Sequence, residues 1–481
     1  QYRSHSHSHR RTHCGQDSEE LFEDEAFPER QLAALVAAKV YYHLGSLDDA
    51  LDIALGAGNF FDLDSTSSFS RTLVGAAVDK FIAGRQSNDG SDGSEVEPRL
   101  VAVMERMFER CFADGEFKQA AGIAIEALWI EKLKEAIQRA PNTSDMLSFT
   151  FHVALNVVKN QTFRHEILRE LVTFYRTLAQ PDYIDICQCL IFLDDASGLA
   201  ELLSSLVGSE GRDRLMAYQL AFDLCDNATQ ELRSKVRAQL PAPTQALPTA
   251  SAGDDEADAG VAAGDAPAAA DLAPMDKVHY ILTGEPSIEI YLQFLYNASN
   301  TDPLILEKLK EQVANGKSVL HSGVVFANSL MCAGTTSDAF LHDNMEWLSK
   351  ATHWARFNAT ASLGVIHKGH LSEGLSLLAP YLPAAGQAAG SPYSEGGALY
   401  GLGIINANHG AGVSKYLLNA LRAAGGDEVV LHGAALGLGV ASMATHDNEA
   451  YTALFDLLNH DQAVAGEAAG VGMGLVMLGL A

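Results

Sequence analysis

The sequence predicts an all-α protein organised as an α-solenoid, a stack of helix hairpins. Its 481 residues are too many for a domain with one ordinary hydrophobic core, so several domains or a repeat array are expected. Hydrophobic residues make up 47% of the chain and aromatic residues only 8%, which suits closely stacked helices better than a β-sandwich. In addition, a pattern of small residues recurs at a nearly constant interval through the second half of the chain.

The first helix hairpin is predicted near the N-terminus. Apolar residues recur at helical spacing from Leu32 to Leu44, and Gly45 follows as a turn residue. Ser46 is a suitable N-cap for a second helix, which we expect to end at Gly56. This hairpin is the first repeating element of a helical rod.

The same turn recurs twice further along the chain. Gly115 takes the place of Gly45 in a second copy, and Gly369 begins a third. A Gly turn followed by an apolar and then a small residue is typical of helix pairs that bury their faces only by stacking.

Residues 241–276 interrupt the helical pattern. This stretch holds five prolines, seven carboxylates and no Lys or Arg. Such a composition cannot bury enough apolar surface to offset its ordering entropy. We therefore expect a flexible acidic linker between the rod and a second array.

The second array repeats two small residues, two positions apart, in five successive units. Gly401 and Gly403 reappear 36 residues later as Gly437 and Gly439. The ten predicted structural positions are Ala327, Ser329, Ser362, Gly364, Gly401, Gly403, Gly437, Gly439, Gly472 and Gly474.

Glycine inside a helix needs a compensating gain. Each Gly costs about 1 kcal/mol relative to Ala, a considerable sum over several units. Close approach of neighbouring helix backbones is the expected gain, because larger side chains would hold the helices apart. A small regular rotation per unit could curve the array into an arc or a closed ring.

These residues resemble a known family. The run from Ser318 to His370, which includes SVLHSGVVFANSLMCAG, is similar to the start of the proteasome/cyclosome (PC) repeats in the larger of the two big non-ATPase scaffolds of the 26S proteasome regulatory particle. RQLAALVAAKVYYHLG, ICQCLIFLDD and MAYQLAFDL resemble the N-terminal rod of that family. The resemblance covers most of the chain from Leu21 to Ala481, apart from the acidic linker.

The resemblance implies a fold and a role. In that family the PC repeats form a toroid of two concentric helix rings, from which the rod projects. It implies a protein without catalytic residues that organises the base by touching ATPase and lid subunits. The family places its ubiquitin-receptor site at the extreme C-terminus, in a region that this chain lacks. Residues 1–20 do not look like the start of the family, and the later repeats are missing.

The predicted organisation follows from these patterns. In order, we expect a disordered His-rich tail (1–20), the helical rod (21–240), the acidic linker (241–276), connecting helices (277–317) and PC repeats cut off at the C-terminus (318–481).

Charge and cysteine content limit the partners. The net charge of -28 disfavours nucleic acid and anionic membrane surfaces. The six cysteines are dilute, no secretory leader opens the chain, and no apolar stretch is long enough to span a membrane. We expect a soluble protein of the cytoplasm and nucleus with reduced thiols.

Motifs for cofactor or metal chemistry were weighed against structural interpretations. Gly316-Lys317-Ser318 resembles the end of a phosphate-binding loop, but Glu311 stands where its first Gly is required. The metal-ligating residue types are His5, His7, His9, His13 and Cys14 in the tail, and Cys187 with Cys189 in an apolar helix. Neither set has the spacing of a closed site, so no cofactor and no metal is expected.

Candidate catalytic residues are similarly unconvincing. His321, His367, His409 and His432 fall in the array without a recognisable nucleophile motif. The acidic pairs Asp48-Asp49 and Asp194-Asp195 are adjacent, so on a helix their side chains point about 100° apart. Helix ends, core positions and solvated faces explain these residues.

Three functional hypotheses remain. The first is a non-catalytic proteasome scaffold, the second a helical-repeat adaptor of another large assembly, and the third an undetected enzyme. The recurring small-residue pairs favour the first over the second. The missing nucleophile, metal set and phosphate loop argue against the third.

Overall fold

The computed structural model describes residues 17–24, 26–62, 67–87, 97–245, 247–248, 272–297, 302–313, 318–382 and 390–479. Within these ranges all regular elements are helices, which confirms the predicted all-α solenoid class. The chain divides into two units, residues 1–193 and 194–481. The boundary falls inside the predicted rod of residues 21–240, so the last helices of that stretch belong with the repeats.

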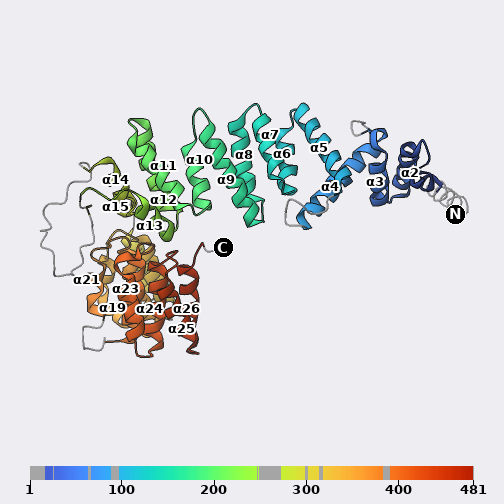
Figure 1. Ribbon diagram of the computed structural model, residues 1–481. Coiled ribbons are helices and arrows are strands. Elements are labelled where there is room, and N and C mark those ends of the chain that lie inside the picture. Colours follow the sequence, from blue (N-terminus) through green and yellow to red (C-terminus); the bar gives the residue numbers. More distant parts are fainter. Residues whose placement is uncertain are drawn as a thin grey trace, which may run out of the picture. The chain divides into compact units, whose positions relative to one another are not determined.

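The first unit is a succession of helices in which each contacts its neighbours in sequence (Figure 1). They are α2 (Arg30–Leu44), α3 (Leu47–Gly56), α4 (Ser68–Ser87), α5 (Pro98–Ala113), α6 (Phe117–Glu126), α7 (Ile130–Arg139), α8 (Thr143–Asn156), α9 (Gln161–Thr177) and α10 (Tyr183–Phe192). A short 3-10 turn, η1 (Gly58–Phe60), follows α3.

The first hairpin forms as predicted. Gly45 has φ +85° and its N–H caps α2, while Ser46 is the N-cap of α3. Gly115 turns the chain in the same way, with φ +80°. Left-handed backbone at these points costs Gly little, whereas a Cβ would add steric strain.

Part of the predicted disordered tail, 1–20, is helical. Residues 17–20 belong to a helix, and the Tyr41 hydroxyl donates to the Glu19 carboxylate at 2.5 Å. This hydrogen bond is the main reason that the pKa of Tyr41 rises to about 12. The contact with α2 explains why the tail prediction was too long. Residues 1–16 lie outside the described residues.

The second unit begins with four helices before the repeats. They are α11 (Ala196–Gly208), α12 (Arg212–Asn227), α13 (Gln230–Gln239) and α14 (Pro274–Ile281). Two further helices, α15 (Glu285–Asn297) and α16 (Pro303–Val313), precede the array itself.

The array alternates long inner helices with shorter outer segments. The inner helices are α17 (Ser318–Met331), α20 (Trp354–Ile366), α22 (Pro392–Ile405), α24 (Glu428–Ala441) and α26 (Ala463–Val476). The outer segments are α18 (Ala339–Asp343), α19 (Met345–Ser349), α21 (Gly374–Leu378) with η3 (Ala379–Tyr381), η4 (Gly410–Gly412) with α23 (Ser414–Ala423), and α25 (Asn448–Leu458).

Helix α13 is bound to the array through backbone groups of the repeat turns. The Gln230 amide nitrogen donates to the carbonyl oxygens of Ala441 and Met443, at 3.0 and 2.7 Å. Its amide oxygen accepts from the Gly410 N–H at 3.4 Å. Arg233 is buried and donates to the Asn408 carbonyl oxygen at 3.3 Å. These bonds explain why α13 belongs to the second unit.

The ends of the predicted linker, 241–276, are joined to each other. The Thr244 N–H and hydroxyl donate to the Asp276 carboxylate at 2.9 and 2.6 Å, and Asp276 is fully buried. His279 Nε2 lies 2.8 Å from the Pro241 carbonyl oxygen. The flexible stretch was therefore predicted too wide at both ends. Residues 246 and 249–271 lie outside the described residues.

Replacement of Gln230 by Ala should weaken the attachment of α13. The Ala441 and Met443 carbonyl oxygens would lose a donor, and a buried acceptor without a partner typically costs about 1–3 kcal/mol. We expect faster hydrogen exchange in residues 230–239 and a lower thermal midpoint. Gln239→Ala, at the exposed end of the same helix, is the matched control. Equal effects of the two substitutions would contradict this role for Gln230.

The Thr244–Asp276 contact should be sensitive to acid. Hydrogen bonds from the Thr244 hydroxyl and N–H lower the pKa of Asp276 below its ordinary value of 3.8. A carboxylate with a lowered pKa stabilises the fold above the unfolded-state pKa, and this is lost as pH falls through the folded-state pKa. Asp276→Asn should therefore lower the thermal midpoint at neutral pH but have little effect well below pH 3.8. A pH-independent difference would argue against the contact.

Candidate functional site: the stacked repeat helices

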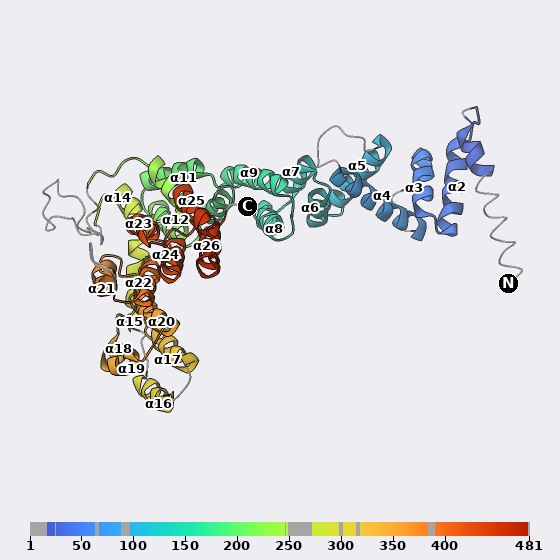
Figure 2. The same cartoon turned by 90° about the horizontal axis from the view of Figure 1, so that it is seen from below.

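The five inner helices stack on one another in chain order. Contacts join α17 to α20, α20 to α22, α22 to α24 and α24 to α26 (Figure 2). Leu399, Leu402, Leu438 and Leu454 are among the buried side chains that fill the space between the inner and outer helices. The candidate site is therefore an extended core rather than a cleft.

In the second small position of a unit, the residue faces the following helix. A Cβ atom on Gly364 would overlap the backbone of Gly401, and one on Gly403 would overlap the backbone of Gly437. A Cβ on Gly439 would lie 2.6 Å from the Gly472 Cα atom. Real Cβ atoms essentially never approach other atoms this closely, so these positions require glycine while the helices keep their spacing.

In the first small position, the residue faces the preceding helix, and the distance that a Cβ atom would have to that helix varies more between units. A Cβ on Gly437 would overlap the Leu399 carbonyl oxygen, and one on Gly472 would lie 2.9 Å from the Ala435 carbonyl oxygen. A Cβ on Gly401 would lie 3.5 Å from the Gly364 nitrogen, an ordinary contact.

The remaining predicted positions differ in their surroundings. Ser329 and Ser362 are buried, and their hydroxyls donate to carbonyl oxygens of their own helices, those of Phe326 and Ala359. Ala327 is half-buried, and a Cβ on Gly474 would meet no atom within 4 Å.

Three further glycines make equally close contacts that the predicted list omits. A Cβ on Gly433 would overlap the Gly396 carbonyl oxygen, and one on Gly397 would overlap the Phe357 carbonyl oxygen. A Cβ on Gly396 would lie 2.5 Å from the Val429 carbonyl oxygen. They lie near the start of their helices. The letters GG before Gly401 and HG before Gly437 place a Gly four residues ahead of both pairs, and this is the signal that could have found them.

The sequence analysis predicted a turn at Gly369 but missed that this position recurs in every unit. Five residues after the second small residue of each unit, the backbone adopts positive φ. These residues are Gly334 (+69°), Gly369 (+90°), Asn408 (+61°), Ala444 (+55°) and Gly479 (+87°). Four of the five are Gly or Asn, the residue types that favour this conformation, and Ala444 is the exception that interrupts the pattern in the sequence.

These left-handed residues join each unit to the next. The Gly334 N–H donates to the Val365 carbonyl oxygen at 3.1 Å, and the Gly369 N–H to that of Ile405 at 3.0 Å. The Asn408 and Ala444 N–H groups donate in the same way to Val440 and Leu475, at 3.2 and 2.9 Å. Each turn thus caps the C-terminal end of the following inner helix, whose last carbonyl groups lack partners within the helix.

The histidines of the array do not converge on one place. The ring of His321 stacks on Trp347, and His367 lies next to Asp338. A ring nitrogen of His409 lies next to the Ala407 carbonyl oxygen, and one of His432 next to the Val464 carbonyl oxygen. Burial lowers the pKa of His321, His367 and His409, so neutral rings are favoured. These are helix-end and core environments, as expected.

The adjacent acidic pairs also occupy structural positions. Asp49 lies in the first turn of α3 and accepts from the Ser46 hydroxyl at 2.5 Å. Asp195 is the N-cap of α11 and accepts from the Gly198 N–H at 3.0 Å. Asp194 lies 3.5 Å from Lys235.

Metal and thiol chemistry finds little support among the described residues. No three His, Cys, Asp or Glu side chains in that part of the chain are grouped to hold a metal ion. Cys187 and Cys189 are thiols buried in α10, and burial raises the pKa of Cys189 to about 12. His5, His7, His9, His13, Cys14, Gly316 and Lys317 lie outside the described residues.

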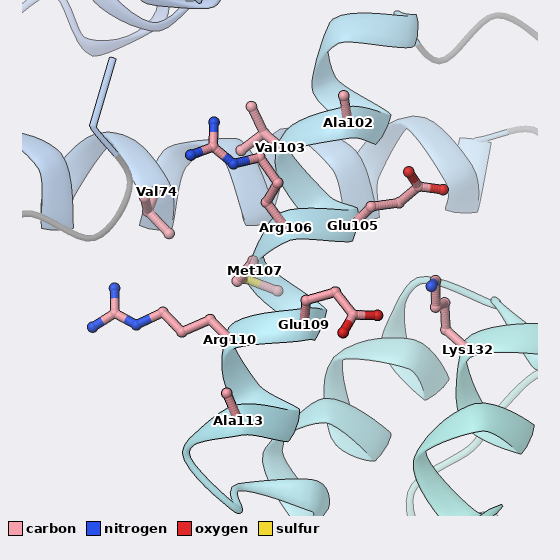
Figure 3. Close-up of a pocket in the computed structure, with 10 residues that line it drawn as sticks. All are labelled: Val74, Ala102, Val103, Glu105, Arg106, Met107, Glu109, Arg110, Ala113 and Lys132. Atoms are coloured by element: carbon pink, nitrogen blue, oxygen red, sulfur yellow. The ribbon is translucent and has the colours of Figure 1, made fainter. Parts of the chain in front are cut away.

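The first unit contains a groove of about 830 Å³ over α5 (Figure 3). Arg106 and Arg110 point toward the Val74 side of α5, and Glu105 and Glu109 toward the Lys132 side. Glu109 is paired with Arg139 at 2.8 Å. No hydroxyl, thiol or imidazole is among the residues that line this groove.

None of the helices in the described ranges could cross a membrane.

Replacement of Gly403 by Ala tests the close helix contact. The methyl group would overlap Gly437, and overpacking typically costs about 1–3 kcal/mol, more than the helix propensity of about 1 kcal/mol that Ala gains. We expect a lower thermal midpoint, and a larger decrease for Gly403→Leu.

Gly401→Ala is the matched control, two residues earlier in the same helix. Its methyl group fits at 3.5 Å, so the gain in helix propensity should leave stability unchanged or raised. If Gly403→Ala behaved in the same way, the close-contact explanation would be wrong.

Comparison with known proteins now identifies the family. The model described as "26S proteasome subunit RPN2, N-terminal domain" matches residues 16–299. The model of the proteasome/cyclosome repeat matches residues 358–387, which include most of α20 and all of α21. The resemblance predicted from the sequence is thereby confirmed.

Curated relatives agree with these models. The 26S proteasome non-ATPase regulatory subunit 1 homolog B of Arabidopsis thaliana is 46% identical, over 96% of this chain and 49% of its own length. The 26S proteasome non-ATPase regulatory subunit 1 of Drosophila melanogaster is 43% identical, over 96% of this chain and 48% of its own length. The 26S proteasome regulatory subunit RPN2 of Saccharomyces cerevisiae is 36% identical, over 96% of this chain and 47% of its own length. The chain spans about half the length of these relatives. It belongs to the RPN2 family of 26S proteasome regulatory subunits.

Proposed function

We propose that this protein is a non-catalytic scaffold of the regulatory particle base, which organises ATPase and lid subunits for ubiquitin-dependent protein degradation. Family membership supports a proteasome regulatory role, and the relatives' names describe non-ATPase subunits. Cytoplasm and nucleus are the proposed locations.

The observation that carries this proposal is the continuous stack of inner helices. Turn hydrogen bonds join every unit to the next from α17 to α26, and close backbone contacts join the helices from α20 to α26. A stack joined in this way resists bending within the array and presents the outer helices at fixed intervals. Such an arrangement suits the positioning of several partners.

A helical-repeat adaptor of another large assembly is the alternative. The same stack could hold other partners, because a solenoid does not by itself define what it binds. The hypothesis of a proteasome scaffold is favoured because these relatives, which are similar over 96% of the chain, are named as proteasome subunits.

Affinity purification of the tagged full-length protein from its own cells tests the proposal. We expect proteasomal ATPase and lid subunits to co-purify, as identified by mass spectrometry. A version with Gly403→Leu should recover less of them, because the stack would be distorted. Recovery of a different assembly without ATPase subunits would support the alternative and refute the scaffold function proposed here.

A further inference from the structure

The outer helices α23 and α25 enclose a groove of about 550 Å³. Its apolar floor is formed by Leu421 of α23, Leu431 of α24 and Ala453 with Leu457 of α25. The volume is within the range of about 300–1,000 Å³ that is typical of ligand sites in proteins. Leu421, Leu431 and Leu457 also belong to the buried hydrophobic core of the array, so the groove opens onto the edge of that core.

One end of the groove is formed by Gly425 and Gly426, beside the side chain of Gln462. Gly425 and Gly426 have φ of +60° and +91°, and a Cβ at Gly426 would meet no atom within 4 Å. The Gln462 amide nitrogen donates to the Gly426 carbonyl oxygen at 3.4 Å and ties this end to the start of α26. Because Gly425 and Gly426 carry no side chain, a ligand can approach their backbone closely.

The groove is lined by two carboxylates, Glu449 and Asp456, together with Arg422 and His460. Asp456 and Glu449 lie on α25 about two turns apart, along the same side of the groove. Glu449 pairs with Arg422 of α23 at 2.9 Å, and both side chains are exposed. Exposed pairs of this kind contribute little stability, so Glu449 can exchange Arg422 for a cation of a ligand at small cost.

The surrounding sequence strengthens this field. From residue 423 to the end, the sequence contains no Lys or Arg. It contains seven carboxylates, Asp427, Glu428, Asp447, Glu449, Asp456, Asp461 and Glu467. A surface with one sign of charge attracts partners of the opposite sign and raises their association rate.

We propose that this groove binds a peptide segment of a partner protein in which an apolar side chain is flanked by Lys or Arg. The apolar side chain inserts between Leu421, Leu431 and Leu457, and the flanking cations pair with Asp456 and Glu449. A buried apolar anchor inside a polar, solvent-exposed rim is the usual arrangement of a protein-binding site. This contact goes beyond the scaffold function proposed above, and its test uses the isolated chain, so its failure would leave that function untouched.

The test uses three fluorescein-labelled, amidated peptides that differ only at the central residues. They are Gly-Lys-Leu-Arg-Gly, Gly-Lys-Ser-Arg-Gly and Gly-Glu-Leu-Glu-Gly. We expect the first to bind in a fluorescence anisotropy titration at low salt, and the Ser and Glu forms to bind at least about tenfold more weakly. Raised salt should weaken the binding of the first peptide.

Variants of the protein assign the binding to the groove. Asp456→Lys should weaken binding of the Lys-Leu-Arg peptide by about tenfold and improve binding of the Glu form. Ala453→Leu should fill the floor and abolish binding, with an unchanged thermal midpoint to show that the fold is retained. Glu467→Lys makes the same charge change at an exposed site that does not line the groove, and should have little effect.

Several outcomes would overturn the proposal. Equal binding of the Leu and Ser peptides would show that the apolar floor is not used. If Glu467→Lys weakened binding as much as Asp456→Lys, the attraction would be diffuse rather than local. Self-association of the chain that Asp456→Lys abolishes, measured by sedimentation, would identify a second copy as the occupant instead.

Discussion

The repeat array depends on direct contact between the backbones of successive inner helices. At Gly364, Gly403 and Gly439 the neighbouring backbone occupies the space that a side chain would need. Helix spacing is thereby set by main-chain atoms, which every unit shares, rather than by side chains that vary between units. The loss of helix propensity, about 1 kcal/mol for each Gly, is offset by dispersion contacts that exist only at this short distance.

The short distance between successive units also allows hydrogen bonds between their turns and helix ends. Each left-handed residue, such as Asn408 or Ala444, donates its N–H to the end of the next inner helix. This satisfies carbonyl groups that a helix terminus leaves free, and it links the units by hydrogen bonds as well as by packing. The carbonyl groups of the turns remain available, and α13 binds to them through Gln230 and Arg233. A helix far away in sequence is thus joined to the array by groups that do not depend on side-chain identity.

The contacts between successive inner helices are mainly apolar or made by the backbone, so they do not depend on charged side chains. The net charge of -28 is therefore available for interaction with partners without disturbing the stack. Two kinds of salt dependence follow. Packing between inner helices should be nearly independent of ionic strength, whereas contacts of the carboxylates in the α23–α25 groove, Glu449 and Asp456, should weaken as salt screens them.

The sequence by itself determined the helical class, the first hairpin at Gly45, the register of the small pairs and the family. These depend on local periodicity and turn chemistry, which can be read along the chain. Only the tertiary structure decided that Gly403 overlaps a neighbour while Gly401 does not, since this depends on the rotation of one helix against another. It likewise decided the pairing of Thr244 with Asp276 and the left-handed backbone of Ala444, because both require contacts between residues distant in sequence.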